Sequence, residues 1–512
     1  MSAPSLDQRT SGVLCHLTSL PGPHGSGDLG LEARRFVDRL AEAGQSFWQM
    51  LPVVPPAGGA SPYQSSSAFA GDPALVSLTM LRDEGLLSDA DLEPDVALPE
   101  ARVSFEPRNA FRASRLRRAF DRMRSDETRA PELFRFCEDQ RAWLDDFALY
   151  SALKDAHDQT AWTSWPGDLA RRDPRALVEA AEQLRSEIGY HQFVQWVFAK
   201  QWAALRAYAK SRGVGLLGDV PIFVGHDSAD VWARPQEYFL DEAGNCTVVA
   251  GVPPDYFSET GQRWGNALYR WDVHERSGFV WWIARLASLF EKFDAVRIDH
   301  FIGFERYWEI DAHAATAVSG RYRPGPGASL FHAVRGALGK LPLVAEDLGV
   351  LTPAVEALRD GLGLPGMRVL HFSFGVSAGD ERSHPHAYPA RAVVFTGTHD
   401  NDTTAGWFTD LSLRAASDEI ARRERTYVLN YLGTDGSEIH WDLIRLALSS
   451  APRTAILPLQ DLLGLGTGAR MNTPGTGSGN WSFRVTEAEL ATVDWARLRY
   501  LTDVFDRAPR PT

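Results

Sequence analysis

Short apolar segments, each bounded by turn-forming residues, recur along the whole chain and alternate with segments of helical periodicity. They span residues 12–15, 47–52, 214–220, 293–298, 341–344, 367–374, 392–396 and 454–459. Apolar runs of this length that alternate with helices are typical of buried strands in a parallel sheet. Eight of them predict an α/β fold, a closed (β/α)8 or TIM barrel, within a single domain over residues 1–512.

Two stretches between the predicted strands are longer than a crossover helix requires. Residues about 73–212 carry aromatic residues at helical spacing between 136 and 150, which predicts a largely helical insertion between the second and third strands. Residues about 225–290 predict a second insertion, whose Gly/Pro-rich 250s loop would cover the C-terminal face of the barrel as a lid. After the last strand we expect long loops but no separate C-terminal β-domain.

Composition excludes several classes of partner. The chain carries 53 Lys and Arg against 66 Asp and Glu, a formal net charge of -13, without a basic cluster, which argues against nucleic acid. It has neither an apolar run long enough to span a bilayer nor a signal-peptide pattern, so we expect a cytoplasmic protein with no membrane partner. Cys15, Cys137 and Cys246 are scattered and predict neither a disulfide framework nor a zinc site. The oligomeric state is not predicted.

The fourth apolar segment ends in charged residues. Val296 and Ile298 alternate with Arg297 and Asp299, so a strand here would direct the two charged side chains to one face. The guanidinium of Arg297 would keep the carboxyl group of Asp299 ionised even in a poorly solvated site, as a nucleophile requires. A purely structural ion pair is the competing interpretation.

Two further strand ends supply carboxyl groups. Glu346 follows the fifth apolar segment, and Asp400 follows the seventh, directly after His399. Because barrel enzymes build their sites at the C-terminal ends of the strands, we expect Asp299, Glu346 and Asp400 to converge. The alternatives are a helix cap at Glu346 or Asp347 and an Asx turn at Asp400.

Glycoside chemistry needs a pair of carboxyl groups, one ionised to attack and one protonated to donate. Asp299 suits the first role, and like charge from Asp299 and Asp400 would raise the pKa of Glu346 for the second. Other polar and aromatic residues suit a groove for a polyhydroxylated ligand: Tyr63, Asp219, Gln262, Trp264 and Asn472. Asp219 could equally serve to orient its neighbours. No His pair has zincin spacing and no Asp-rich loop resembles a calcium site, so we expect no metal and no cofactor.

Sequence blocks along nearly the whole chain resemble those of the 4-α-glucanotransferases, also called amylomaltases or disproportionating enzymes, of the α-amylase clan. They include SPYQS at 61, GDVPIFV at 218, GQRWGN at 261, RIDHF at 297, AEDLG at 345 and TGTHDND at 396. Each block is weak evidence separately, but their common order and spacing make the resemblance specific.

The resemblance implies that Asp299 is the nucleophile, Glu346 the general acid/base and Asp400 a carboxylate that binds hydroxyl groups of the donor sugar. It further implies that Arg297 and His399 support the reacting sugar, and that the groove residues named above contact the glucan. The implied reaction moves an α-1,4-glucan segment from a maltooligosaccharide or longer α-glucan to the 4-hydroxyl of an acceptor through a glycosyl-Asp intermediate. The residue types leave two alternatives open: an amylase-type hydrolase and a non-catalytic glucan-binding protein.

Overall fold

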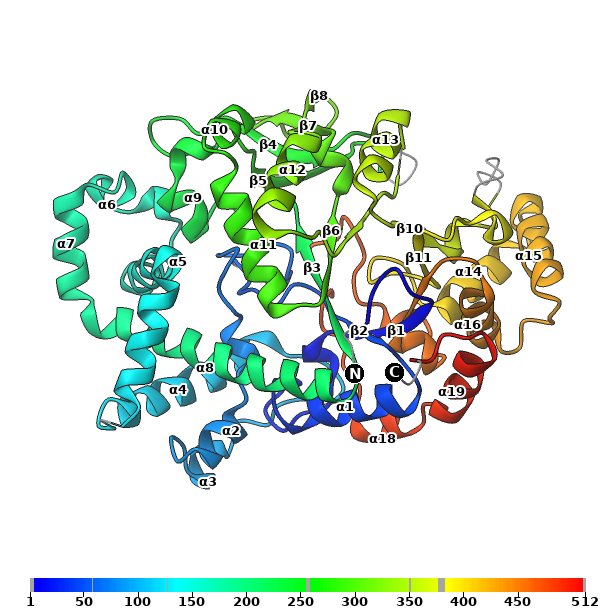
Figure 1. The fold of residues 1–512 in the computed structure, drawn as a ribbon, viewed down its shortest axis with the longest axis horizontal. Coiled ribbons are helices and arrows are strands. Elements are labelled where there is room, and N and C mark those ends of the chain that lie inside the picture. The colour runs from blue at the N-terminus through cyan, green and yellow to red at the C-terminus, as the bar shows by residue number, and fades with distance from the viewer. Residues whose placement is uncertain are drawn as a thin grey trace.

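The structure is a computed structural model that describes residues 4–57, 59–126, 128–254, 258–349, 351–375 and 383–509. Among these residues, eight parallel strands close into a barrel in the order β1-β12-β11-β10-β9-β6-β3-β2 (Figure 1). The strands are β1 (Thr10–Leu14), β2 (Phe47–Gln49), β3 (Gly215–Pro221), β6 (Ala295–Asp299), β9 (Leu343–Ala345), β10 (Gly366–Val369), β11 (Ala392–Phe395) and β12 (Thr454–Pro458). Each overlaps one predicted segment, so the TIM barrel is confirmed. β10 is shorter than predicted because Leu370–Phe372 turn into a 3-10 helix.

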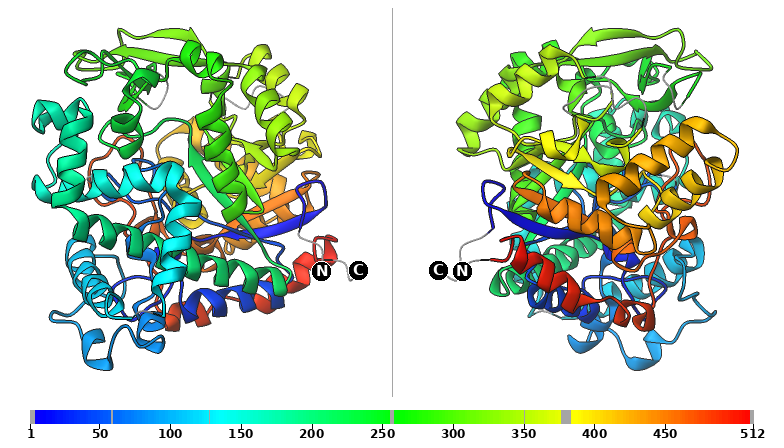
Figure 2. Two further views of the ribbon diagram at one scale, coloured as in Figure 1. Left: turned by 60° about the vertical axis from the view of Figure 1, so that its left-hand side comes forward. Right: turned by 90° about the vertical axis from the view of Figure 1, so that its right-hand side faces the viewer.

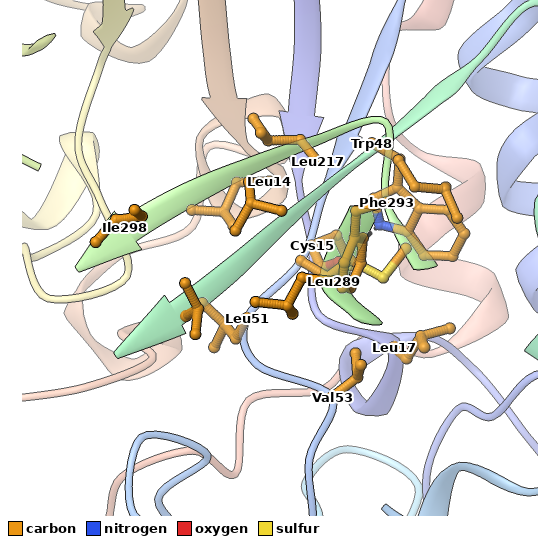
Figure 3. Packing of buried hydrophobic residues seen from close by; sticks show 14 of the residues in the cluster. Leu14, Cys15, Leu17, Trp48, Leu51, Val53, Leu217, Leu289, Phe293 and Ile298 are labelled. Carbon is orange, nitrogen blue, oxygen red and sulfur yellow. Dashed lines mark hydrogen bonds between the residues drawn. The ribbon is translucent and has the colours of Figure 1, made fainter. Parts of the chain in front are cut away.

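Large apolar side chains from neighbouring barrel strands and adjoining segments pack together in one buried cluster (Figure 3). Trp48 of β2 is fully buried, and its indole Nε1 donates a hydrogen bond to the carbonyl oxygen of Cys15 at 2.7 Å. Phe293 packs against Gly218 of β3 so closely that a Cβ there would lie 2.5 Å from the ring. Burying a phenylalanine side chain contributes about 1.5–3 kcal/mol. Glycine at 218 is therefore what lets Phe293 pack this closely against β3.

Crossover and C-terminal helices surround the barrel strands. They are α1 (Leu31–Glu42), α11 (Val280–Lys292), α12 (Ala328–Leu338), α13 (Pro353–Leu362), α14 (Thr404–Arg414), α15 (Glu419–Leu432), α16 (Ile439–Ser449), α17 (Leu459–Leu462), α18 (Glu487–Ala491) and α19 (Trp495–Val504). At α13 the residues at the two ends show why the helix begins and ends where it does. Thr352 caps its N-terminus by accepting a hydrogen bond from the N–H of Val355, and Gly363, at φ +75°, ends it in the left-handed conformation.

Between β2 and β3 the chain forms a series of helices that Figures 1 and 2 show on one side of the barrel, away from α14 to α16. They are α2 (Leu78–Asp83), α3 (Asp89–Leu92), α4 (Phe105–Met123), α5 (Ala130–Ala156), α6 (Gly167–Ala170), α7 (Pro174–Gln183) and α8 (Arg185–Ser211). Two buried glutamines join α8 to the segment after β2. The amide of Gln195 exchanges two hydrogen bonds with the backbone of Gly71, and that of Gln201 does so with Ser77.

A second, antiparallel sheet in the order β5-β4-β7-β8 is built from segments on both sides of β6 and lies at the top of Figure 1. Its strands are β4 (Val248–Val252), β5 (Gln262–Ala267), β7 (Arg306–Asp311) and β8 (Arg321–Pro324), and the short helices α9 (Ala229–Ala233) and α10 (Trp271–Arg276) flank it in the chain. The sequence pattern did not predict this sheet. Residues 255–257 of the predicted 250s lid lie outside the described residues. No helix in the described parts of the chain is both long enough and apolar enough to cross a membrane.

Candidate active site

Two carboxyl groups come from neighbouring positions on adjacent barrel strands. β6 and β9 pair in parallel with Ile298 opposite Ala345. Asp299 directly follows Ile298 in the sequence, and Glu346 directly follows Ala345. The backbone N–H of Glu346 donates to the carbonyl oxygen of Ile298 at 3.0 Å, which continues the pairing beyond β9. The barrel therefore holds Asp299 and Glu346 side by side although they are distant in sequence.

Arg297 is the centre of a buried charge network. Its Nη1 donates to both carboxylate oxygens of Asp219, at 2.8 and 2.7 Å, and its Nη2 donates to Oδ1 of Asp299 at 2.7 Å. Although burial opposes it, the charges of these two carboxylates raise the pKa of Arg297 well above its usual range. The hydroxyl of Tyr63 donates to Oδ2 of Asp219 at 2.8 Å. Asp299 is thus hydrogen-bonded to a permanent positive charge, the guanidinium of Arg297, which Asp219 holds in position.

Glu346 has an environment that favours the protonated form. Its side chain accepts hydrogen bonds from two backbone N–H groups, those of His300 at 2.7 Å and Leu348 at 3.0 Å. Burial, and to a smaller extent the like charge of Asp299, raise the pKa of Glu346 to about 8 and outweigh these two bonds and the charge of Arg297, which favour the ionised form. The direction agrees with the sequence-based expectation, but burial rather than like charge is the main cause. Asp299, hydrogen-bonded to Arg297, and Glu346, whose pKa is raised by burial, therefore lie close together in unlike electrostatic environments.

Asp400 follows β11 and is fixed by the loop after β12. Nδ2 of Asn472 donates to Oδ1 of Asp400 at 2.6 Å, and Nη2 of Arg470 donates to the Asp400 carbonyl oxygen at 2.6 Å. Nε2 of His399 lies 3.3 Å from the same Oδ1. The carboxylate is still 42% exposed, so it is oriented by its neighbours while remaining open to a ligand.

These groups face a large open cleft with a volume of about 1320 Å³. Nine of the predicted site residues line it: Tyr63, Gln262, Trp264, Arg297, Asp299, Glu346, His399, Asp400 and Asn472. The tenth, Asp219, is only 2% exposed and lies beneath Arg297 and Tyr63. The three predicted carboxylates thus share one cavity, and Asp219 acts through its neighbours. Among the described residues, no cluster of three or more His, Cys, Asp or Glu side chains is arranged to hold a metal ion.

Aromatic rings form part of the cleft wall. Tyr63 stacks on His399, with ring centres 5.1 Å apart and planes 13° apart, and Trp481 lies within 6 Å of both rings. On another part of the wall, Trp264 meets His300 edge to face at 4.9 Å. Flat apolar rings beside hydrogen-bonding groups suit the faces of sugar rings.

Three residues of the site were not predicted as such. Trp481 has φ +65°. The guanidinium of Arg470 orients Asp400 by donating to its backbone carbonyl oxygen. His300, at φ +53°, directs its N–H toward Glu346. For His300 a signal was available, because it directly follows Asp299 at the strand end. The roles of the other two depend on how the loop after β12 folds against Asp400, which no local pattern encodes.

A (β/α)8 barrel with paired carboxyl groups at its strand ends and a long aromatic-lined cleft belongs to the class of barrel enzymes that act on carbohydrates. The sequence model of one family, described as 4-alpha-glucanotransferase, matches residues 15–490. The chain belongs to this family of 4-alpha-glucanotransferase enzymes.

Individual relatives align with this chain over nearly their whole lengths. The chain is 49% identical to a 4-alpha-glucanotransferase of Thermus thermophilus over 98% of this chain and 99% of that protein, and 46% identical to one of Synechocystis over the same shares. The solved structure of an amylomaltase from Streptococcus agalactiae in complex with acarbose superposes with a TM-score of 0.93 at 36% identity, covering 98% of this chain and 100% of that one. The confirmed family is the one that the sequence blocks indicated.

Proposed function

We propose that this enzyme transfers segments of maltooligosaccharides and longer α-1,4-glucans to the 4-hydroxyl of an acceptor sugar, with retention of configuration, in the cleft that Asp299, Glu346 and Asp400 share. The observation that carries the proposal is the pair of adjacent carboxyl groups in unlike environments, Asp299 beside Arg297 and Glu346 buried with a pKa of about 8. One ionised and one protonated carboxyl group across a scissile bond is the requirement for this chemistry.

In the first step Asp299 attacks the anomeric carbon of the donor. One of its carboxylate oxygens is held by Arg297, and the other, which accepts no hydrogen bond within the described residues, forms the new bond to carbon. The bond between the anomeric carbon and the glycosidic oxygen breaks, and protonated Glu346 gives its proton to that oxygen. The leaving glucan departs as a neutral alcohol, and a glycosyl ester of Asp299 remains.

In the second step Glu346 changes from acid to base. Esterification removes the negative charge of Asp299 but leaves the positive charge of Arg297, so the pKa of Glu346 falls and its carboxylate form becomes available. It accepts the proton of the acceptor 4-hydroxyl, whose oxygen attacks the anomeric carbon and releases Asp299. Two inversions at one carbon give net retention and a new α-1,4 bond.

The other residues at the reacting centre bind and orient the sugar. Asp400 is exposed and preoriented by Asn472, which suits it to accept hydrogen bonds from sugar hydroxyls. Tyr63, stacked on His399, offers a ring face to the apolar side of a glucose unit, while Gln262 and Trp264 stand on another stretch of the same wall. These contacts use binding energy to hold the reacting atoms in line.

We place this activity in the cytoplasm. Cys15, Cys137 and Cys246 are free thiols, as is usual in a reducing compartment. Maltooligosaccharides and intracellular storage glucans are then the substrates available to it.

Incubation of the purified protein with maltotriose tests the proposed reaction. Transfer predicts glucose together with a ladder of products longer than the substrate, whereas a hydrolase would yield shorter sugars only and a binding protein would yield no change. Asp299→Asn should lower turnover at least about 10³-fold. The matched control, Asp410→Asn, changes an exposed aspartate of α14 and should behave like the wild type. A ladder that persists in Asp299→Asn would refute the assignment of the nucleophile.

A further inference from the structure

The second sheet carries a cluster of side chains that the reaction at the barrel centre does not use. β7 and β8 pair with Trp308 opposite Tyr322 and Arg306 opposite Pro324, so Arg306, Trp308 and Tyr322 share one face of the sheet. All three line the same cleft as Asp299 and Glu346. We call these three residues the β7–β8 patch.

The aromatic rings of the patch are held but not covered. The rings of Trp308 and Tyr322 meet edge to face, with centres 4.8 Å apart and planes at 72°. Nε1 of Trp308 donates to the carbonyl oxygen of Ala317 at 2.9 Å, which fixes the indole. Tyr322 nevertheless remains 43% exposed. A large aromatic side chain left open on the wall of a cleft points to a ligand that covers it.

Arg306 supplies unused hydrogen-bond donors beside these rings. Its guanidinium carbon lies 4.3 Å from the centre of the Tyr322 ring, and its nearest carboxylate contact is Nε to Glu305 at 3.7 Å. Among the described residues this guanidinium donates no hydrogen bond, and its Nε is buried without a partner. The buried Nε is out of a ligand's reach, but Nη1 and Nη2 make no hydrogen bond among the described residues and belong to a side chain that is 26% exposed, so an acceptor in the cleft can bind them.

The opposite face of the same strands makes the patch rigid. Nε of Arg321 donates to Oε1 of buried Glu309 at 2.7 Å, and Nε of Arg323 lies 3.6 Å from its other oxygen. These contacts join β8 to β7 and neutralise charge on that face. The patch is therefore a preformed surface on paired strands and not a loop that must be ordered on binding.

The outer ring of the patch, Tyr322, lies well away from the part of the wall beside Asp299. Trp264, which meets His300 beside Asp299, is on β5, and the sheet order β5-β4-β7-β8 puts Tyr322 three strands away. At the usual strand spacing this is about 14 Å, the span of several glucose units. A ligand that reaches both must be an extended chain.

We propose that the β7–β8 patch is a distal subsite for the α-1,4-glucan chain, in which a glucose ring lies against Tyr322 and Trp308 while its hydroxyl oxygens accept hydrogen bonds from Arg306. The inference rests on the proposed function and deepens it, because it assigns preference for long chains to these residues. A neutral polyhydroxylated ring matches an apolar platform flanked by free donors. The patch makes no contact with the reacting atoms, so it selects by length and not by chemistry.

The test compares a short and a long substrate. Initial rates are measured with maltotriose and with amylose plus glucose as acceptor, for the wild type, Tyr322→Ala, Arg306→Gln and Tyr322→Phe. The matched control is Tyr500→Ala, because Tyr500 is 65% exposed on α19, far from β8 in both Figures 1 and 2. Thermal unfolding midpoints of all variants establish that they fold.

Loss of the platform predicts that Tyr322→Ala and Arg306→Gln raise KM for amylose about 3- to 10-fold, from the energy of one aromatic or hydrogen-bonded contact. The kcat/KM of these two variants for maltotriose should stay within about twofold of the wild type. Tyr322→Phe should retain the wild-type KM for amylose. Tyr500→Ala should change neither the KM for amylose nor the kcat/KM for maltotriose. An unchanged amylose KM in both patch variants would overturn the inference. Equal losses on both substrates would also overturn it, because they would mean an effect on the catalytic centre. Failure of the proposed function is distinguishable, since the wild type itself would then form no transfer products.

Discussion

Asp219 offers a sharp test of how the site is supported, because it is buried and does not itself line the cleft, yet it holds the residue that contacts the nucleophile. In Asp219→Asn the carboxylate that accepts two hydrogen bonds from Nη1 of Arg297 and one from the Tyr63 hydroxyl becomes an amide. An amide has one acceptor oxygen and two donor hydrogens. At least one of its contacts with Arg297 or Tyr63 would then set donor against donor.

The size of the effect follows from the geometry. Removing one partner of a buried ion pair costs about 3–5 kcal/mol of unfolding free energy. Arg297 keeps its second partner, Asp299, at 2.7 Å, so we expect the lower end, about 3 kcal/mol. Without the carboxylate of Asp219, Asp299 is the only anion hydrogen-bonded to the guanidinium, which then stabilises the ionised ground state of Asp299 more strongly. We expect kcat/KM to fall about 100-fold, equivalent to about 2.7 kcal/mol of lost transition-state stabilisation.

Urea unfolding monitored by tryptophan fluorescence, with maltotriose kinetics on the same preparation, measures both effects. The control is again Asp410→Asn, whose partner Arg414 is half exposed; that pair should contribute less than about 1 kcal/mol. If Asp219→Asn unfolded within about 1 kcal/mol of the wild type and kept its turnover, Arg297 would not depend on Asp219 for its position. The account of the buried charge network would then be wrong.

Two further predictions concern the carboxylates that face the cleft. Glu346 must be protonated for the first step and its raised pKa is about 8, so kcat/KM should be at its plateau below that pH and fall as pH rises through about 8; a pH-rate profile with its basic limb near the ordinary glutamate range would contradict this. Asn472→Ala removes the 2.6 Å hydrogen bond to Asp400, and the loss of a bond to a charged group predicts a fall in kcat/KM of about 10- to 100-fold. Because Asp400 is exposed, the thermal midpoint of Asn472→Ala should barely change, and a large stability loss with normal kinetics would assign Asn472 a structural role instead.

The barrel could be predicted because its strands are buried on both faces and appear in the sequence as continuous apolar runs. The second sheet lacks that signal. All four residues of β8 are exposed, and β5 mixes Gln262, Arg263 and Asn266 with a glycine, so neither strand carries an apolar run. The strands of this sheet pair because the barrel brings segments before and after β6 together. That proximity depends on the tertiary fold, and no local sequence pattern encodes it.

The site, too, could be predicted only where local sequence patterns specify it. Asp299, Glu346 and Asp400 could be predicted because each stands within a few residues after an apolar run, and strand ends in a barrel meet on one face. The sequence could not separate residues on the cleft wall from those behind it, so it left open whether Asp219 lies in the groove or orients its neighbours, and the structure places it buried under Arg297. The place of Trp481 depends on its positive φ and on packing against Tyr63 and His399, both set by the folded loop.

The most direct test of the double displacement is to capture the glycosyl ester and locate it. Glu346→Gln treated with α-maltotriosyl fluoride needs no acid to expel the leaving group but lacks the base for the second step, so the intermediate should accumulate. Rapid acid quenching, proteolysis and mass spectrometry should then find the maltotriosyl mass on the peptide that contains Asp299. An adduct on Asp400 or Asp219 instead, or consumption of the fluoride with no adduct on any peptide, would contradict the proposed mechanism.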